Sequence, residues 1–237
     1  MPKAWIDVPA LKSRLGRFFR VDRDEWSRFG SSVNQVFEAY VFAQVMARYQ
    51  HMDGWTVTII NPTSPVAGSA PSVRLKFSTR GRPGGYSYAR CTSPEGVVFQ
   101  IRHQLRVATR HHEHGSIPPS NICLDVAVIV DSDLDQFSTN DFVPNGSLVT
   151  FGEAKHMSAF AELVAAFVGL VHEMQPERLG RARLPTFTPA PHPAPFLFVS
   201  GYFWRTAEGL VKTLADRQMD IDVRNRDNPL SPTIRLP

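Results

Sequence analysis

The sequence predicts an α/β protein in which helices flank a mixed central sheet on both faces. The first observation is the order of periodic segments along the chain, which is helix, several strands, helix, strand and helix. The second is that two strand segments are short, apolar and β-branched, which is typical of central strands. A chain of 237 residues with 43% hydrophobic content can also fill a sizeable core. We therefore expect one domain over residues 1–237, with its core at about 24–223 and a short irregular C-terminal tail.

The first long helix is expected at residues 24–50, where apolar residues recur with a period near 3.6 and Asp24 is a candidate cap. Between Val36 and Met46 the pattern is apolar almost all round. Such a helix is enclosed by the rest of a fold. Glu38 stands inside this enclosed stretch, unless the apolar stripe is narrower and Glu38 faces solvent.

Strands and two further helices follow. Expected strands lie at residues 55–60, 73–78, 97–107, 122–130 and 148–154, and segments rich in Pro, Gly or Ser separate the first three. Within 97–107, Phe99, Ile101, His103 and Leu105 occupy alternate positions. Helices are expected at 158–174 and 206–217, a buried strand at 196–199 between them, and a short edge strand at 221–223.

Composition excludes several classes of protein. Charged residues make up 20% and aromatic residues 11% of the chain, which fits neither disordered, collagen-like nor disulfide-dense proteins. The first residues are too polar for a secretory signal, and no stretch approaches the ~18 apolar residues of a membrane span. We expect a cytoplasmic protein with no membrane partner. Cys123 lies in an apolar run, which favours a buried free thiol over a disulfide with Cys91.

The formal net charge of +4 permits a polyanionic partner without requiring one. Its distribution is more informative, because residues 72–90 contain five cations and no acidic residue, with aromatic residues interleaved. Such a segment can follow a phosphate backbone and stack on bases. The candidate nucleic-acid contacts are Arg74, Lys76, Arg80, Arg82, Tyr86 and Arg90. A solvated loop with routine surface arginines is the alternative.

Three residues on two consecutive expected strands form a candidate phosphodiesterase site. Glu153 and Lys155 are two apart on a strand, so both side chains project from the same face. Asp125 interrupts an otherwise apolar strand, where a carboxylate costs several kcal/mol unless something binds it. Phosphodiester cleavage needs a hard cation held by converging carboxylates, and a nearby lysine can orient the attacking water.

The run ICLDVAVIVD, followed after a loop by FGEAKHM, resembles the PD-(D/E)xK, or restriction-endonuclease-like, superfamily of nucleases. Over residues 24–199 the order of helix, β-meander, helix and strand is also similar to that family, although Leu124 stands where the pattern has proline. The resemblance implies that Asp125 and Glu153 are metal ligands and that Lys155 positions the water. It also implies Glu38 as a further metal ligand, because many members add a glutamate from the first core helix.

The activity implied is that of a Mg²⁺-dependent endonuclease, with Mn²⁺ as a substitute, acting on DNA rather than RNA. Prokaryotic defence, restriction or repair is the expected setting, and a homo-oligomer is compatible with it. The alternative function is a non-catalytic or ligand-activated module that binds nucleic acid or a protein partner on the same fold.

Other assignments of the same residues stay open. Glu153 and Lys155 could form an exposed ion pair on an edge strand, worth under ~1 kcal/mol. Asp125 could pair with an arginine while Asp131, Asp133 or Asp141 takes its metal role. His156 faces away from Lys155 along the strand and is expected to be structural. The adjacent residues His111, His112, Glu113 and His114 lack the usual ligand spacing of a zinc site.

Overall fold

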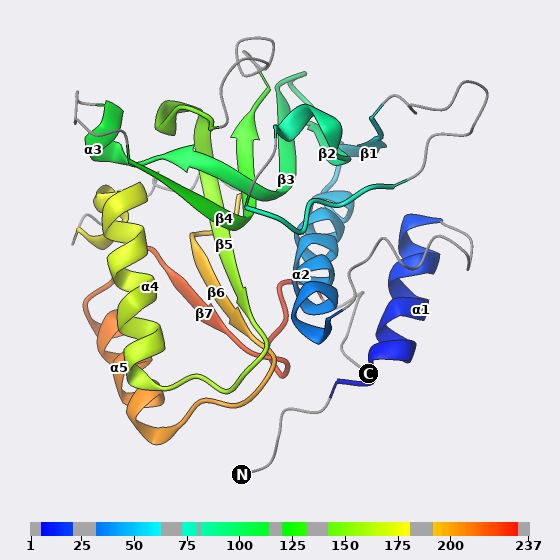
Figure 1. The fold of residues 1–237 in the computed structure, drawn as a ribbon. Helices are drawn as coiled ribbons and strands as arrows, with labels where there is room; N and C mark the ends of the chain where they lie inside the picture. Colours follow the sequence, from blue (N-terminus) through cyan, green and yellow to red (C-terminus); the bar gives the residue numbers. More distant parts are fainter. Residues whose placement is uncertain are drawn as a thin grey trace.

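The computed structural model describes residues 6–20, 32–62, 73–79, 82–113, 120–131, 142–180 and 192–231. Within them, seven strands form one sheet whose spatial order follows the chain (Figure 1). The strands are β1 (Thr56–Ile60), β2 (Tyr88–Thr92), β3 (Val98–Ala108), β4 (Asn121–Val130), β5 (Leu148–Lys155), β6 (Phe196–Val199) and β7 (Asp222–Arg224). Strands β1 to β5 are antiparallel neighbours, whereas β5, β6 and β7 are parallel. The expected α/β class with a mixed sheet is confirmed.

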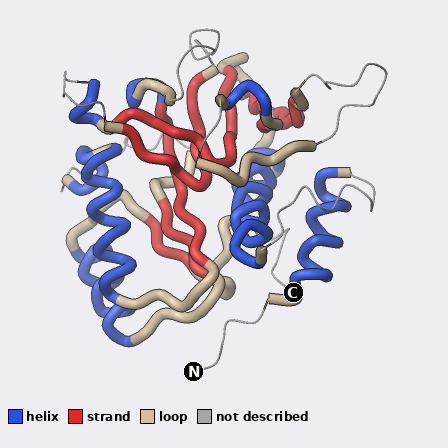
Figure 2. Tube along the Cα trace, viewed as in Figure 1, coloured by secondary structure: helices blue, strands red, loops and turns tan. Residues whose placement is uncertain are grey.

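Helices cover both faces of this sheet (Figures 1 and 2). Helices α1 (Val8–Phe19) and α2 (Val33–Gln50) pack on one face, and α4 (Ala161–Met174) and α5 (Arg205–Asp216) pack on the other. A one-turn helix, α3 (Arg110–Glu113), follows β3. In the part of the chain that the structure describes, none of the helices has the length and apolar character needed to cross a membrane.

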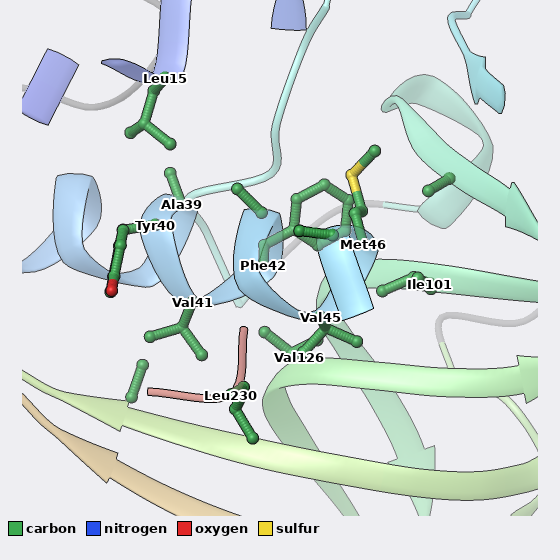
Figure 3. Close-up of a cluster of buried hydrophobic side chains, with 14 of the residues drawn as sticks. Leu15, Ala39, Tyr40, Val41, Phe42, Val45, Met46, Ile101, Val126 and Leu230 are labelled. Atoms are coloured by element: carbon green, nitrogen blue, oxygen red, sulfur yellow. The ribbon is translucent and has the colours of Figure 1, made fainter. Parts of the chain in front are cut away.

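Helix α2 is enclosed, as its all-round apolar pattern predicts. It begins at Val33, because Ser32 and Gln35 form a capping box. The expected start near Asp24 lies outside the described residues. One side of α2 packs against α1 and the other against the sheet, as Figure 3 shows for Leu15 beside Ala39 and for Val45 beside Val126. We call this cluster the α2 core.

The packed part of the chain extends beyond the expected core of 24–223. Leu11, Leu15 and Phe19 of α1 and Leu230 near the C-terminal end are buried in the α2 core. Helix α1 precedes the first helix that the sequence pattern predicted, at residues 24–50. Pro9 is tolerated in the first helical turn, where its missing N–H leaves no bond unmade, and the side chain of Asp7 caps this helix.

Two strand predictions need correction. The expected strand at 73–78 is irregular, whereas β2 lies between residues 78 and 97, where the sequence predicted turn or loop. Strand β2 buries Ala89 and Cys91 in the α2 core and turns Arg90 outward. Small residues on the buried face give a weak hydrophobic alternation, and the neighbouring arginines hide it.

The apolar side chains of β3 point to one face of the sheet in its first half and to the other face in its second half. Phe99 and Ile101 belong to the α2 core, whereas Leu105 and Val107 belong to the cluster around α4 and α5, which we call the α4 core. The change occurs at Gln104, whose φ of 53° lies in the left-handed region. Alternate residues of 97–107 therefore do not share one face, contrary to the simple period of two.

The ring of Phe196 on β6 packs closely against Gly152 of β5, next to the candidate site residue Glu153. A Cβ on Gly152 would lie 2.0 Å from the ring of Phe196, so only glycine allows this contact. The next residue of β5 is Glu153, which lies opposite Leu197 in the parallel ladder. The packing of β6 against Gly152 therefore holds the end of β5 that carries Glu153 and Lys155.

Candidate active site

The structure brings Asp125, Glu153 and Lys155 together on neighbouring strands. The ammonium of Lys155 donates to Asp125 Oδ2 at 2.9 Å and to Glu153 Oε2 at 2.8 Å. The N–H of Ala154 donates to Asp125 Oδ2 at 2.9 Å, and the N–H of Asp125 to Glu153 Oε1 at 3.4 Å. Strands β4 and β5 are interior to the sheet, so the alternative of an ion pair on an edge strand is wrong.

Glu38 of α2 reaches the same place from the other layer. Its carboxylate Oε2 accepts a hydrogen bond of 2.9 Å from Nε2 of Gln104, and the same Nε2 donates to Asp125 Oδ1 at 3.0 Å. The side chain of Glu38 is only 17% exposed, so it does not face open solvent. Three carboxylates from α2, β4 and β5 are thus connected through one amide and one ammonium group.

A buried histidine, His103, lies beside Glu38. The Nδ1 atom of His103 contacts the carbonyl oxygen of Lys76, and burial lowers the pKa of the ring to about 4. The ring is therefore neutral, and Nδ1 must carry the proton that the carbonyl accepts. The Nε2 atom consequently presents a lone pair, has no hydrogen-bond partner among the described residues, and lies 3.6 Å from Glu38 Oε2.

The electrostatics of the site are unfavourable for its carboxylates. Burial and then the charge of Asp125 raise the pKa of Glu38 to about 7, although Gln104 and Lys155 oppose the shift. Burial and the Asp125 charge also raise the pKa of Glu153. Burial alone would lower the pKa of Lys155, but the charges of Glu153 and Asp125 outweigh it and raise that pKa. Lys155 is therefore protonated and counters only part of the negative charge.

Replacing Glu38 by glutamine is expected to stabilise the metal-free protein at pH 8 by about 1–2 kcal/mol, after discounting for partial exposure. The pKa of Glu38 rises from 4.5 to about 7 on folding, so its ionisation opposes folding as the pH rises through that window. Below about pH 4.5 the carboxyl is protonated in both states and the gain should disappear. Urea unfolding in chelator at pH 8 and pH 4 measures both values.

The matched control is Glu95→Gln, an exposed glutamate in the turn between β2 and β3. It should change the free energy of unfolding by less than about 0.5 kcal/mol at either pH. A Glu38→Gln variant that is less stable than the wild type at pH 8 would contradict the unfavourable burial of this carboxylate.

The donor set fits a hard divalent cation, because three carboxylates supply the oxygen ligands that Mg²⁺ and Mn²⁺ prefer. The raised pKa of Glu38 also agrees with a cation site, since a bound cation would favour the ionised form of this carboxyl. As arranged, however, no group of three or more His, Cys, Asp or Glu side chains among the described residues is poised to hold a metal. The ammonium of Lys155 occupies one oxygen each of Asp125 and Glu153, so a cation would compete with it, whereas the neutral amide of Gln104 leaves the charge of Glu38 and Asp125 in place.

The basic segment borders the site. Lys76 is 3% exposed and its ammonium donates to the carbonyl oxygen of Gln104 at 2.9 Å. This places Lys76 in the wall of the site and not on an open surface. Arg74 is exposed and lies over the ring of Tyr86, with 5.2 Å between Cζ and the ring centroid.

The remaining predicted nucleic-acid contacts are more scattered. Arg82 is exposed just before the short 3-10 helix Pro83–Gly85. Arg90 is half exposed and pairs with Asp131 at 3.2 Å, and Arg80 lies outside the described residues.

The alternative site residues lie elsewhere or cannot be placed. Asp131 follows β4 and binds Arg90 and Gln100, six residues from Asp125, so the structure does not bring it to the carboxylate cluster. Asp133 and Asp141 lie outside the described residues. His156 Nδ1 lies 2.8 Å from Ser200 Oγ and its ring packs near Phe37, which agrees with a structural role.

The His-rich segment follows β3 as the short helix α3 and leaves the described part of the chain. His111 is exposed, and nothing is described for the side chains of 112–119. The zinc alternative is therefore not tested by the described residues.

Sequence reasoning missed two residues that contact the carboxylates, His103 and Gln104. A strand with His and Gln in adjacent positions between apolar residues gives a weak polar signal, QIRHQLRV, which resembles routine alternation. His103 faces α2 as Phe99 and Ile101 do, whereas the left-handed backbone lies at Gln104, whose side chain binds Glu38 and Asp125.

Comparison with protein-family models, with curated proteins and with solved structures finds no match for this chain. The site itself is a cluster of three carboxylates with one lysine, at the junction of an enclosed helix and two interior strands.

Proposed function

We propose that this chain is a metal-dependent phosphodiesterase that cleaves DNA, with a restriction-endonuclease-like fold. The order of elements supports the fold, because α2, β3, β4, β5, α4 and β6 follow the order of helix, antiparallel meander, helix and parallel strand expected for that family. The candidate ligands also lie on the expected elements, with Asp125 on β4, Glu153 and Lys155 on β5, and Glu38 on α2.

The observation that carries the proposal is the clustering of three carboxylates with a single lysine in a largely buried place. A purely structural role would leave fewer unpaired charges, since buried carboxylates are costly unless each is fully compensated. Within the described part of the chain, one ammonium serves both Asp125 and Glu153, while the donor to Glu38 is a neutral amide. Perturbed carboxyl groups of this kind are more common at functional sites than elsewhere.

Each residue has a distinct role in this proposal. Asp125 and Glu153 hold the cation, and Glu38 completes its carboxylate ligands from the other layer. A divalent cation supplies Lewis acidity that neutralises charge developing on the phosphate. Lys155 remains protonated beside Glu153 and Asp125, so its ammonium orients the attacking water rather than removing its proton.

The surface next to the site supports a polyanionic substrate. The segment 73–79 runs along β3, because Lys76 contacts His103 and Gln104, and Arg106 donates to Thr79. Arg74 therefore lies on a segment that borders the carboxylate cluster, and its guanidinium lies over the ring of Tyr86. Cations and an aromatic ring beside the cluster suit a phosphate backbone with accessible bases.

Cleavage of supercoiled plasmid by the purified protein tests the proposal. We expect nicked and linear products with Mg²⁺ and with Mn²⁺, and none with chelator. Single-stranded DNA and RNA of matched length should be assayed in parallel to compare the substrates. Activity that persists in chelator would rule out a metal-dependent site, and cleavage of RNA alone would overturn the assignment to DNA.

A second candidate is a non-catalytic or ligand-activated module on the same fold. The observation that favours it is the closed arrangement of the site, in which Lys155 and Gln104 occupy the carboxylate oxygens. Such a module would bind DNA equally well with Mg²⁺ and with chelator. Absence of plasmid cleavage together with metal-independent binding would favour this candidate over the enzyme.

A further inference from the structure

Gln104 occupies an unusual backbone position in the middle of a sheet. Its φ of 53° lies in the left-handed region, which glycine adopts freely and asparagine or aspartate less readily. The ladder with β4 keeps the same register on both sides, from His103 opposite Val126 to Leu105 opposite Leu124. The strain is therefore confined to Gln104, which lies between these two pairs and faces Asp125 in that register.

The polar groups of Gln104 are engaged around the site. The amide Nε2 donates to Glu38 at 2.9 Å and to Asp125 at 3.0 Å. The amide Oε1 accepts from the thiol of Cys123 at 3.3 Å, which fixes which end of the amide faces the carboxylates. The backbone carbonyl oxygen of Gln104 accepts a hydrogen bond of 2.9 Å from the ammonium of Lys76, and this bond holds the distorted backbone in place.

We propose that Gln104 is a positioning residue that holds Glu38 and Asp125 in register for one shared divalent cation. This inference rests on the proposed function, because it assigns a role at the same site. Glu38 comes from α2 and Asp125 from β4, and β5 holds only one oxygen of Asp125, Oδ2, through Ala154 and Lys155. The Nε2 atom of Gln104 binds the other oxygen of Asp125 and also Glu38, so it sets how the two carboxylates face each other.

The choice of glutamine agrees with this role. A neutral amide orients two carboxylates without removing the negative charge that a cation needs, whereas a lysine or arginine would neutralise it. Backbone strain of this kind persists where a side chain has a function that an unstrained residue cannot serve. Glycine would relieve the strain at Gln104 but would lose both hydrogen bonds.

The test compares Gln104→Met with Gln100→Met. Both glutamines are buried on β3, but Gln100 binds Asp131 and Arg102, outside the carboxylate cluster. Calorimetric titration with Mn²⁺ should show a Kd that is about 10–100-fold weaker for Gln104→Met, the range found when partners that orient metal ligands are removed. Gln100→Met should bind Mn²⁺ within about twofold of the wild type.

A second readout is the Mg²⁺ concentration that gives half-maximal plasmid cleavage. It should rise in Gln104→Met by a similar factor, whereas a purely structural role would lower the melting temperature without changing the Mg²⁺ requirement. If Gln104→Met does not fold, Gln104→Asn replaces it, since asparagine tolerates the left-handed backbone and keeps the amide. Its shorter side chain cannot reach both carboxylates, so weaker Mn²⁺ binding is still expected.

The outcomes separate this inference from the proposed function. Unchanged or tighter Mn²⁺ binding in a folded Gln104 variant overturns the positioning role and leaves the metal site standing. Absence of Mn²⁺ binding by the wild type overturns the metal site and the role of Gln104 with it. The wild type could also bind Mn²⁺ without cleaving DNA. If the Gln104 variant then binds Mn²⁺ more weakly, the result supports the positioning role of Gln104 and contradicts only the nuclease assignment.

Discussion

Glu153→Gln is expected to lower the rate of Mg²⁺-dependent plasmid cleavage by about 10³-fold or more. The substitution removes a negatively charged metal ligand while keeping the size of the side chain, and metal assistance is worth several kcal/mol in such reactions. The folded state should not lose stability at neutral pH. Burial and the neighbouring charge of Asp125 raise the pKa of Glu153, so a neutral amide removes an unfavourable charge.

The control for this variant is Glu173→Gln, which changes an exposed glutamate in the last turn of α4. Its cleavage rate should stay within about twofold of the wild type. Plasmid cleavage time courses and thermal melts of the three proteins provide the measurement. A Glu153→Gln protein that cleaves at the wild-type rate would show that this carboxylate is not a metal ligand of the reaction.

Lys155→Ala is expected to reduce both activity and stability. The ammonium lies 2.9 Å from Asp125 and 2.8 Å from Glu153, so its loss leaves two carboxylates facing each other. Cleavage should fall by about 10²–10⁴-fold, the range for a residue that handles the attacking water. Stability in chelator should fall by about 1–3 kcal/mol, less than for a fully buried pair because the lysine is 37% exposed.

The pH dependence of the stability of Lys155→Ala identifies the cause of its lower stability. At pH 8 the carboxylates are ionised and repel each other, whereas near pH 5 protonation of Glu153, whose pKa is raised, should remove much of the difference. Added Mn²⁺ should restore part of the stability at pH 8, because it neutralises the same oxygens. The control is Lys212→Ala, an exposed lysine of α5, for which none of these changes is expected.

The opposite signs expected for Glu153→Gln and Lys155→Ala distinguish a functional site from a structural ion pair. In a structural pair, removal of either partner lowers stability. In a site with an excess of carboxylates, removal of one carboxylate relieves repulsion and removal of the lysine increases it. Equal destabilisation by both variants would therefore favour a structural pair.

The parts of the fold that could be predicted depend on strong local patterns. Strands β4, β5 and β6 are apolar runs, and α4 has a broad apolar stripe. Such segments are stable only when they are buried, so their sequences predict their place in the core. Strand β2 was missed because Ala89 and Cys91 are small, and helix α1 precedes the first helix that the sequence pattern predicted. Those elements exist because the α2 core encloses them, which is a tertiary effect.

The sequence by itself determined the mixed α/β architecture and the placement of Asp125, Glu153 and Lys155 on two consecutive strands, because periodicity is a local property of the chain. It also singled out Glu38, since a lone carboxylate in an all-round apolar helix is costly to bury. Only the tertiary structure decided that Glu38 meets Asp125, and that His103 and Gln104 belong to the same site. The physical reason is that the left-handed turn of the backbone at Gln104 is stabilised by contacts from Lys76, Cys123 and α2, which are distant in sequence.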